Sequence, residues 1–256
     1  MFCVGRSFVG TNFEFELCAE TVTSCAAALR GGASRIELCR ALNLGGLTPD
    51  ASTIRLAVGQ SGVPVHVLLR PSPEHFRSSS KIFGEIVNAM DQARELGAAG
   101  FVLGLLRFDG TVDVEHTRQL VEHAHPLPVT FHRAFDQTPD LESALEAVIR
   151  TGCKRILTSG GEANVLAGAA ALARLNHQAG DRIEIMAGGR LRRENARKVA
   201  TLSQVRHFHS SLGELEGDSD THLPPWLRIR QLIDALGEPT DGTMNEVADH
   251  EKDCRT

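Results

Sequence analysis

Tyrosine is absent from this chain of 256 residues, and lysine occurs only at positions 81, 154, 198 and 252. The absence of tyrosine excludes catalysis by a phenolic acid. A Schiff-base aldolase needs a lysine at the catalytic end of a core strand, whereas Lys154 stands at the start of an expected strand. The sequence therefore predicts no Schiff-base lysine.

Nucleotide-binding motifs and paired cysteines are also missing. No G-x-G-x-x-G segment follows an expected strand and there is no P-loop, so a nucleotide cofactor has no support. The six cysteines, at positions 3, 18, 25, 39, 153 and 254, form no C-x-x-C pair, which excludes a zinc ribbon, a thioredoxin motif and a secreted disulfide scaffold. We expect reduced thiols and a cytoplasmic location.

Positive charge and long apolar runs are scarce as well. The net charge is −5 and the pI is near 6.1. No basic stripe could neutralise a nucleic-acid backbone, so nucleic acid is excluded as the main partner. No apolar run approaches the roughly 18 residues of a membrane span. Residues 1–6 lack the features of a signal peptide, and we expect no membrane partner.

What the chain does contain is a regular alternation of strand-like and helix-like patterns. Eight such units favour a single (β/α)8 TIM barrel over a doubly wound sheet, which would want fewer units or a second domain. The expected strands are Phe13–Cys18, Arg35–Cys39, Pro64–Arg70, Gly100–Gly104, Leu127–His132, Arg155–Ser159, Arg182–Ala187 and Val205–Ser210.

Glycines and Thr-Pro-Asp segments mark where helices end and begin. The glycines at 31–32, 97 and 152 fall where a helix stops before a strand, as suits a left-handed helix C-terminus. Thr48-Pro49-Asp50 and Thr138-Pro139-Asp140 each offer an N-cap hydroxyl, a proline for the first helical position and an early acid. We therefore expect two helices to be capped by these threonines.

The barrel is expected to span residues 13–236, after an N-terminal extension at residues 1–12. Residues 237–256 show little periodicity and many charges, which predicts a disordered, solvated tail. The polar stretch 213–225 is expected to form the long loop after the last strand.

Polar residues concentrate at the carboxyl ends of the expected strands, where barrels carry their chemistry. Two consecutive strands end in Glu-Leu-Cys, at residues 16–18 and 37–39. Because residues two apart on a strand share a face, each glutamate shares a face with its cysteine. Burying these carboxylates is costly unless partners, a ligand or a water-filled mouth compensate. The two strand ends therefore predict a site.

Further segments at the strand ends are Gly45-Gly46-Leu47-Thr48-Pro49, Arg70-Pro71, Pro128-Val129-Thr130-Phe131-His132-Arg133-Ala134-Phe135-Asp136, Leu157-Thr158-Ser159-Gly160 and Phe208-His209. Together with the two Glu-Leu-Cys ends, these segments resemble those of the CutC family, historically called copper homeostasis proteins. The resemblance runs from about residue 14 to about residue 211. It implies a TIM barrel, a cytosolic location, a homo-oligomer, and a copper(I) site at Cys18 and Cys39.

The chemistry of the two thiols agrees with that implication. Cys18 and Cys39 are soft ligands suited to copper(I), which accepts two or three thiolates. The alternative is that both are small buried hydrophobes, the usual state of free cysteines. The chain departs from the family pattern at Pro71–Phe76 and at Ala187–Arg190. Both segments belong to the mouth, so the shape of a ligand is not transferred.

Four ionisable residues are candidates for catalytic proton transfer: Glu16, Glu37, His132 and Asp136. The mouth of a barrel can raise a carboxyl pKa into the working range. The alternative for the two glutamates is a buried ion-pair network with Arg70 and Arg133. For His132 it is an imidazole that is hydrogen-bonded within the barrel rim.

A small anionic metabolite is the other ligand that these segments predict, with arginines to clamp it and glycine turns whose backbone N–H groups can approach it. The residues expected to bind it are Arg70, Arg133, Ser159, Gly160, Gly161, Gly188, Gly189 and His209. Three functions stay open: copper(I) binding in copper homeostasis, an acid/base lyase or isomerase for a small anionic or phosphorylated substrate, and an inactive assembly scaffold. The ionisable mouth disfavours the scaffold.

Overall fold

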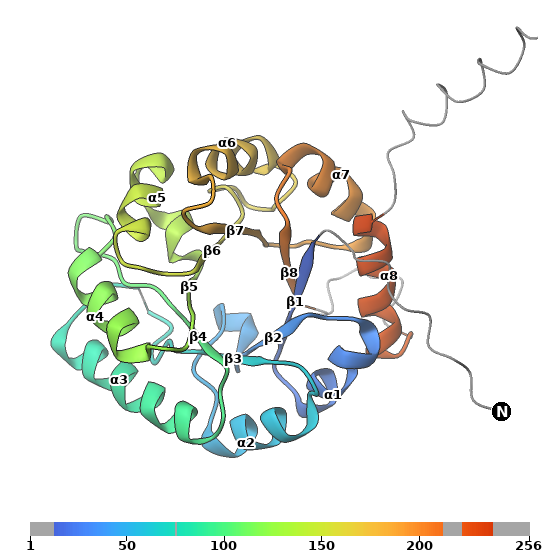
Figure 1. Ribbon diagram of the computed structural model, residues 1–256, viewed down its shortest axis with the longest axis horizontal. Helices are drawn as coiled ribbons and strands as arrows, with labels where there is room; N and C mark the ends of the chain where they lie inside the picture. The colour runs from blue at the N-terminus through green and yellow to red at the C-terminus, as the bar shows by residue number, and fades with distance from the viewer. Residues whose placement is uncertain (1–12, 75, 212–221, 238–256) are drawn as a thin grey trace, which may run out of the picture.

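The computed structural model describes residues 13–74, 76–211 and 222–237. Within these ranges, eight parallel strands pair in sequence order and the eighth pairs with the first, which closes a barrel. Figure 1 shows the ring of strands inside a ring of helices. The predicted TIM barrel is confirmed. The predicted extension at 1–12, most of the long loop and the tail beyond residue 237 lie outside the described residues.

Each predicted strand has a counterpart in the barrel, and most counterparts are a few residues shorter. Apolar residues at the strand ends, such as Leu69, stay buried after regular strand pairing has stopped, so hydrophobicity alone extends the pattern. The strands are β1 (Glu14–Ala19), β2 (Arg35–Leu38), β3 (Val65–Leu68), β4 (Gly100–Leu103), β5 (Val129–Phe131), β6 (Arg155–Thr158), β7 (Glu184–Ala187) and β8 (His207–Ser211).

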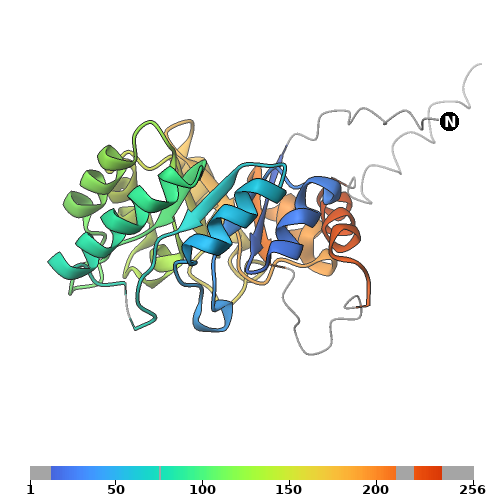
Figure 2. The same ribbon diagram turned by 90° about the horizontal axis from the view of Figure 1, so that it is seen from below.

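The helices cover the outside of the barrel, and Figure 2 shows them along its side, with the loop around residues 42–44 projecting from one end. The predicted glycine joints are confirmed at Gly32, Gly97 and Gly152, whose φ angles are 93°, 91° and 81°. The helices are α1 (Val22–Gly31), α2 (Ala51–Gln60), α3 (Ser80–Glu95), α4 (Val114–Ala124), α5 (Leu141–Ile149), α6 (Ala169–Ala179), α7 (Arg193–Ser203) and α8 (Pro225–Gly237), with short 3-10 helices η1 (Leu42–Leu44) and η2 (Arg133–Gln137).

The ends of two predicted segments need correction. Gly237, expected to open the tail, is the last residue of α8. Pro225, expected to close the long loop, is the first residue of the same helix. None of the helices in the described part of the chain is both long and apolar enough to cross a membrane.

The two Thr-Pro-Asp segments do not start helices as predicted. In Thr48-Pro49-Asp50 and Thr138-Pro139-Asp140 the aspartate is the N-cap. Each aspartate accepts a hydrogen bond from the backbone N–H three residues later, at 2.9 Å from Thr53 and 2.7 Å from Ser143. A carboxylate is favoured because its charge also interacts with the helix dipole. The Thr48 hydroxyl instead accepts from the N–H of Arg70 at 2.8 Å.

The interior of the barrel carries ion pairs at its amino end as well as polar groups at its carboxyl end. Arg35 of β2 binds Glu14 of β1 at 2.5 Å, and Arg155 of β6 binds Glu184 of β7 at 2.9 Å. His66 of β3 is buried, and burial lowers its pKa to about 4. The imidazole is therefore neutral at physiological pH.

Two glycines on and after β4 leave room inside the barrel for imidazole rings. A Cβ at Gly100 would lie 2.7 Å from the Nε2 atom of His66. A Cβ at Gly104 would lie 2.6 Å from the Nδ1 atom of His132. Side chains at these two positions would displace the rings, so the glycines fix where both histidines can lie.

We expect Gly168→Ala to destabilise the fold, because a Cβ there would lie 1.7 Å from the backbone oxygen of Ser159. The loss should be roughly 1–3 kcal/mol or more, as for overpacking of a core. As a matched control, Gly84→Ala inside α3 meets nothing within 4 Å among the described residues. It should stabilise by about 0.5–1 kcal/mol through helix propensity. Urea unfolding measures both, and a neutral Gly168→Ala would contradict the packing.

Candidate metal centre at the mouth of the barrel

The carboxyl ends of three adjacent strands bring together a thiol, a carboxyl group and an imidazole. Cys18 of β1 pairs with Glu37 of β2 in the sheet register, and His209 comes from β8 on the other side of β1. One ligand atom from each of the three lies within 4.8 Å of the other two, and all three side chains are buried. Such a group could hold a metal ion.

Cys39 adds a second sulfur to this cluster. Its Sγ atom lies 3.7 Å from the Sγ atom of Cys18. Cys39 follows β2 directly, and its N–H donates to the carbonyl of Ala19 at 3.0 Å, which continues the pairing of β1 with β2. Cys39 is fully buried, packed with Leu68 and Val102. The structure thus brings the two predicted thiols together.

Glu16 lies beneath the cluster and contacts both strands that flank β1. Its carboxylate accepts a hydrogen bond from Nε of Arg35 at 2.6 Å and lies 2.8 Å from Nδ1 of His209. Burial alone would raise the pKa of Glu16, but Arg35 and His209 hold it well below its usual range. Burial would lower the pKa of His209, but Glu37 and Glu16 raise it. Because Nδ1 is bound to Glu16, Nε2 is the nitrogen left for a ligand.

Glu37 has a different environment from Glu16. Its Oε1 accepts from the Cys18 thiol at 3.6 Å, and its buried Oε2 has no hydrogen-bond partner among the described residues. Burial raises the pKa of Glu37 to about 7. The contact with Cys39, burial and the nearby Glu37 raise the pKa of the Cys18 thiol well above its usual value. The site therefore holds protons that a bound ion would displace.

A cavity of about 530 Å³ lies over this cluster at the mouth of the barrel. Its lining includes Cys18, Glu37, His132, Arg133 and His209. The cavity is where a ligand would meet the thiol of Cys18.

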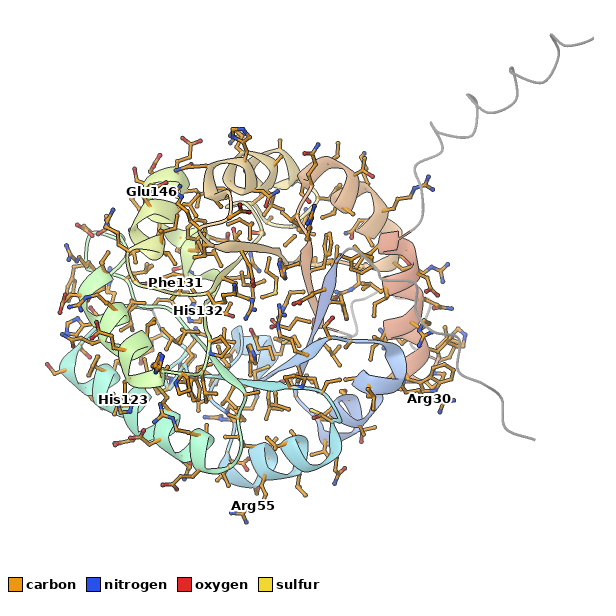
Figure 3. The ribbon with its side chains drawn as sticks, viewed as in Figure 1. Arg30, Arg55, His123, Phe131, His132 and Glu146 are labelled. Atoms are coloured by element: carbon orange, nitrogen blue, oxygen red, sulfur yellow. The ribbon has the colours of Figure 1, made fainter. Side chains whose placement is uncertain are left out.

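His132 lies at the far wall of this cavity, after β5. Figure 3 shows it on the inner side of the ring of strands. Its Nδ1 accepts from the N–H of Ala134 at 3.2 Å, and its ring lies against Phe76 with centroids 4.8 Å apart. Burial and the nearby Arg70 lower its pKa to about 3. The neutral ring thus offers an Nε2–H donor, which suits it less to the role of a general base.

Arg70 does not line the mouth cavity, so its predicted role as an anion clamp is not supported. Its guanidinium donates to the carbonyls of Leu44 at 2.9 Å, Gly46 at 2.8 Å and Pro73 at 2.8 Å. These bonds join the loops after β2 and β3. Arg70 therefore holds the rim together, and it is not the ion-pair partner foreseen for the two glutamates.

Asp136 is likewise engaged, by Arg133 of its own loop and by residues at the end of β6 and in the loop after it. Its carboxylate accepts from Nε of Arg133 at 2.7 Å, from the hydroxyl of Thr158 at 2.5 Å and from the N–H groups of Ser159 at 3.1 Å and Gly161 at 3.2 Å. Both oxygens are used. The predicted role in proton transfer is not supported, because the carboxylate fixes the loop after β6, and Ser159 belongs to the same network.

Three of the four glycines predicted to bind an anion through their backbone N–H groups donate these groups to other residues of the protein. The N–H of Gly160 donates to the Thr158 hydroxyl at 2.9 Å, and that of Gly188 to the Thr158 carbonyl at 3.0 Å. The N–H of Gly161 is bound to Asp136. Gly189, with a φ of 108°, is the one of the four that lines the mouth cavity.

Sequence reasoning missed Arg35, Arg190 and Arg192. Arg35 opens β2 two residues before Glu37, so period-two alternation places it on the same inward face. This alternation could have been used to predict Arg35 as a residue of the site. Arg190 and Arg192 follow β7 and line the mouth cavity. The sequence assigns the segment Ala187–Arg190 to the mouth, but a loop has no periodicity that would show which of its side chains face the cavity.

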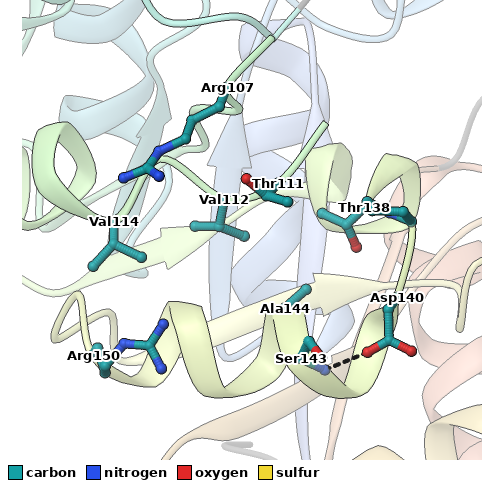
Figure 4. Close-up of a pocket in the computed structure, with 10 residues that line it drawn as sticks. Arg107, Thr111, Val112, Val114, Thr138, Asp140, Ser143, Ala144 and Arg150 are labelled. Atoms are coloured by element: carbon teal, nitrogen blue, oxygen red, sulfur yellow. Dashed lines mark hydrogen bonds between the residues drawn. The ribbon is translucent and has the colours of Figure 1, made fainter. Parts of the chain in front are cut away.

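A second cavity of about 530 Å³ lies outside the barrel, beside α5 (Figure 4). Arg107 and Arg150 point into it, and Val112 and Ala144 belong to its lining. It contains none of the residues predicted for the site. The mouth cavity is therefore the candidate functional site.

A closed (β/α)8 barrel whose mouth gathers two thiols, an imidazole and a carboxyl group defines a TIM-barrel protein with a candidate site for a soft metal. The chain belongs to the CutC family, whose family model matches residues 13–214. A protein of that family from Chromobacterium violaceum is 45% identical over 196 residues, which cover 77% of this chain and 79% of the relative.

Solved structures agree. A crystal structure of a candidate copper homeostasis protein CutC from Streptococcus agalactiae is similar with a TM-score of 0.72 at 30% identity, covering 77% of this chain and 97% of its own. Thiamine phosphate pyrophosphorylase from Pyrococcus furiosus is similar with a TM-score of 0.57 at 16% identity, covering 88% and 96%. The latter shares the fold alone.

Glu37 should make the metal-free protein less stable as the pH rises. Its pKa is about 7 in the fold against an ordinary 4.5, so the unfolded chain loses this proton first and stability falls between these values. The free energy of unfolding of the Glu37→Gln variant, relative to that of the wild type, should therefore increase by about 2–3 kcal/mol from pH 5 to pH 8. Urea unfolding at both pH values measures the gain, and an equal difference at both would contradict the assignment.

Proposed function

We propose that this protein binds copper(I) through Cys18 and Cys39, with His209 as a third ligand, and that it acts in copper homeostasis. The observation that carries the proposal is the 3.7 Å contact between the two sulfur atoms at the mouth of the barrel. Thiolates are the ligands that copper(I) prefers. The family to which the chain belongs and the name of its structural relative support the same metal.

The separation of the sulfurs supports more than two ligands. With metal–sulfur bonds of about 2.3 Å, as in zinc thiolates, a linear ion would hold its sulfurs about 4.6 Å apart. Trigonal or tetrahedral geometry would hold them about 3.8–4.0 Å apart, close to the 3.7 Å observed. His209 is a nitrogen donor in reach of Cys18. Oε2 of Glu37, which has no hydrogen-bond partner in the described part of the chain, is an oxygen donor beside it.

Glu16 supports the proposed site as a positioning residue. A metal-binding imidazole commonly bonds through its other nitrogen to a carboxylate, which fixes the orientation of the ring. The Nδ1 of His209 has this partner in Glu16, which Arg35 holds in turn. Because a bound metal must displace the thiol protons, affinity should rise with pH.

The reduced protein should bind about one copper(I) per chain, and Cys18→Ser combined with Cys39→Ser should abolish binding, because both soft ligands are lost. Competition with bicinchoninate under anaerobic conditions measures the affinity. Cys153→Ser is the control, since Cys153 is buried after α5 and away from the mouth.

Full affinity in the double variant would show that the site is misassigned, with Cys3 and Cys254, which lie outside the described residues, as the remaining candidates. Tighter binding of zinc(II) than of copper(I) by the wild type would keep the site and overturn the metal. The first outcome is read from the bicinchoninate competition, and the second from a parallel competition for zinc(II) against a zinc indicator.

A second candidate function is supported by the pKa of Glu37, which is about 7 in a residue that lines the mouth cavity. Such a group can serve as acid or base near neutral pH. With the Nε2–H of His132 as a donor and Arg133 as a cation, the mouth suits an acid/base lyase or isomerase acting on a small anionic or phosphorylated substrate.

If that enzyme function holds, a phosphorylated metabolite at a hundredfold excess over its dissociation constant should stabilise the protein by about 2.7 kcal/mol. The gain should persist in the Cys18→Ser and Cys39→Ser double variant, because the anion would bind the cavity and not the sulfurs. Thermal unfolding against a metabolite library, with and without copper(I), makes the measurement. No stabilisation by any anion would exclude this function.

A further inference from the structure

The wall of the mouth cavity carries more cationic than anionic side chains, although the chain carries a net charge of −5. Arg133, Arg190 and Arg192 line it, together with the acids Glu20 and Glu37, and Arg133 is paired with Asp136. Arg190 is exposed, and its guanidinium has no hydrogen bond or ion pair to the described residues. A bare metal cation would be repelled by this wall, whereas an anion would be attracted.

The backbone holds Arg190 in place at some cost. Its φ is 56°, in the left-handed region that favours glycine. The side chain of Asn195 donates to the carbonyl of Arg190 at 2.9 Å and accepts from the N–H of Arg192 at 2.9 Å, which maintains the turn. A strained residue that presents an unpaired cation to a cavity is a candidate for ligand binding.

We propose that copper(I) reaches the site as the complex of a small thiol that carries carboxylates, and that Arg190, with Arg133 and Arg192, recognises those carboxylates. The proposal rests on the copper function argued above. A guanidinium pairs well with a carboxylate. The cavity of about 530 Å³ is in the range of small-molecule sites, whereas the ion itself needs no such space.

The transfer is an exchange of thiolates and involves no oxidation. Copper(I) arrives bound to two carrier thiolates. As the sulfurs of Cys18 and Cys39 form bonds to copper, the two copper–carrier bonds break, and the two cysteine protons pass to the departing thiolates. Charge is conserved and the metal stays copper(I). Cys18 lines the cavity while Cys39 lies buried behind it, so the exchange begins at Cys18.

Two carriers of equal length, one with a carboxylate and one without, isolate the contribution of the carboxylate. Copper(I) is presented as its complex with 3-mercaptopropionate or with 3-mercaptopropionamide, at low ionic strength and without oxygen. The rate at which copper enters the metal-free protein is measured by rapid gel filtration and metal analysis. The ratio of the two rates should fall roughly tenfold in Arg190→Gln, as electrostatic steering is lost, and further in Arg190→Glu.

Arg55→Gln is the matched control, because Arg55 is an exposed arginine on α2 at the outside of the barrel (Figure 3). It should leave the ratio unchanged. Equal ratios in the wild type and both Arg190 variants would overturn this proposal while the copper function stands. If the wild type takes copper from neither carrier, the copper function itself fails and the proposal with it.

Discussion

The carboxylate of Glu16 bonds at once to the two strands on either side of its own, through Arg35 at 2.6 Å and His209 at 2.8 Å. Because β1 lies between β8 and β2, this contact spans the seam at which the barrel closes. Removing these groups from water costs several kcal/mol per ion, so each needs its partner in good geometry. The same contact turns His209 toward Cys18 and Glu37, so closure of the fold and formation of the site depend on one buried network.

Two glycines without side chains, Gly100 on β4 and Gly104 directly after it, determine the shape of the barrel interior. TIM barrels commonly fill their interior with branched apolar side chains in layers. Here Gly100 and Gly104 leave that space to His66 and His132, whose rings would collide with any larger residue. Both rings are neutral, because burial lowers the pKa of each. Polar groups can therefore fill the interior beside β4 without adding charge there, while the ion pairs lie between β1 and β2 and between β6 and β7.

The barrel and the thiol pair could be predicted because both depend on local regularities. Strands and helices alternate along the chain, and Glu-Leu-Cys places each cysteine on the face of its glutamate. The partner of Glu16 could not be read in this way, since His209 is 193 residues away and meets it only through barrel closure. The surroundings of Asp136 could not be predicted either, because they include backbone N–H groups of the loop after β6, which no residue pattern reveals.

A site with two sulfurs that opens on one side constrains how a metal ion can enter and leave. Cys18 faces the cavity, whereas Cys39 is buried behind it against Leu68 and Val102. An incoming ion must meet Cys18 first, and any ligand that removes the ion must approach along the same path. Arg190 at the rim then selects the copper complex that enters, because its charge repels a free cation and attracts an anionic thiol complex. Under the proposed function, the thiols determine which metal is bound, and the arginines determine which complex of that metal enters the cavity.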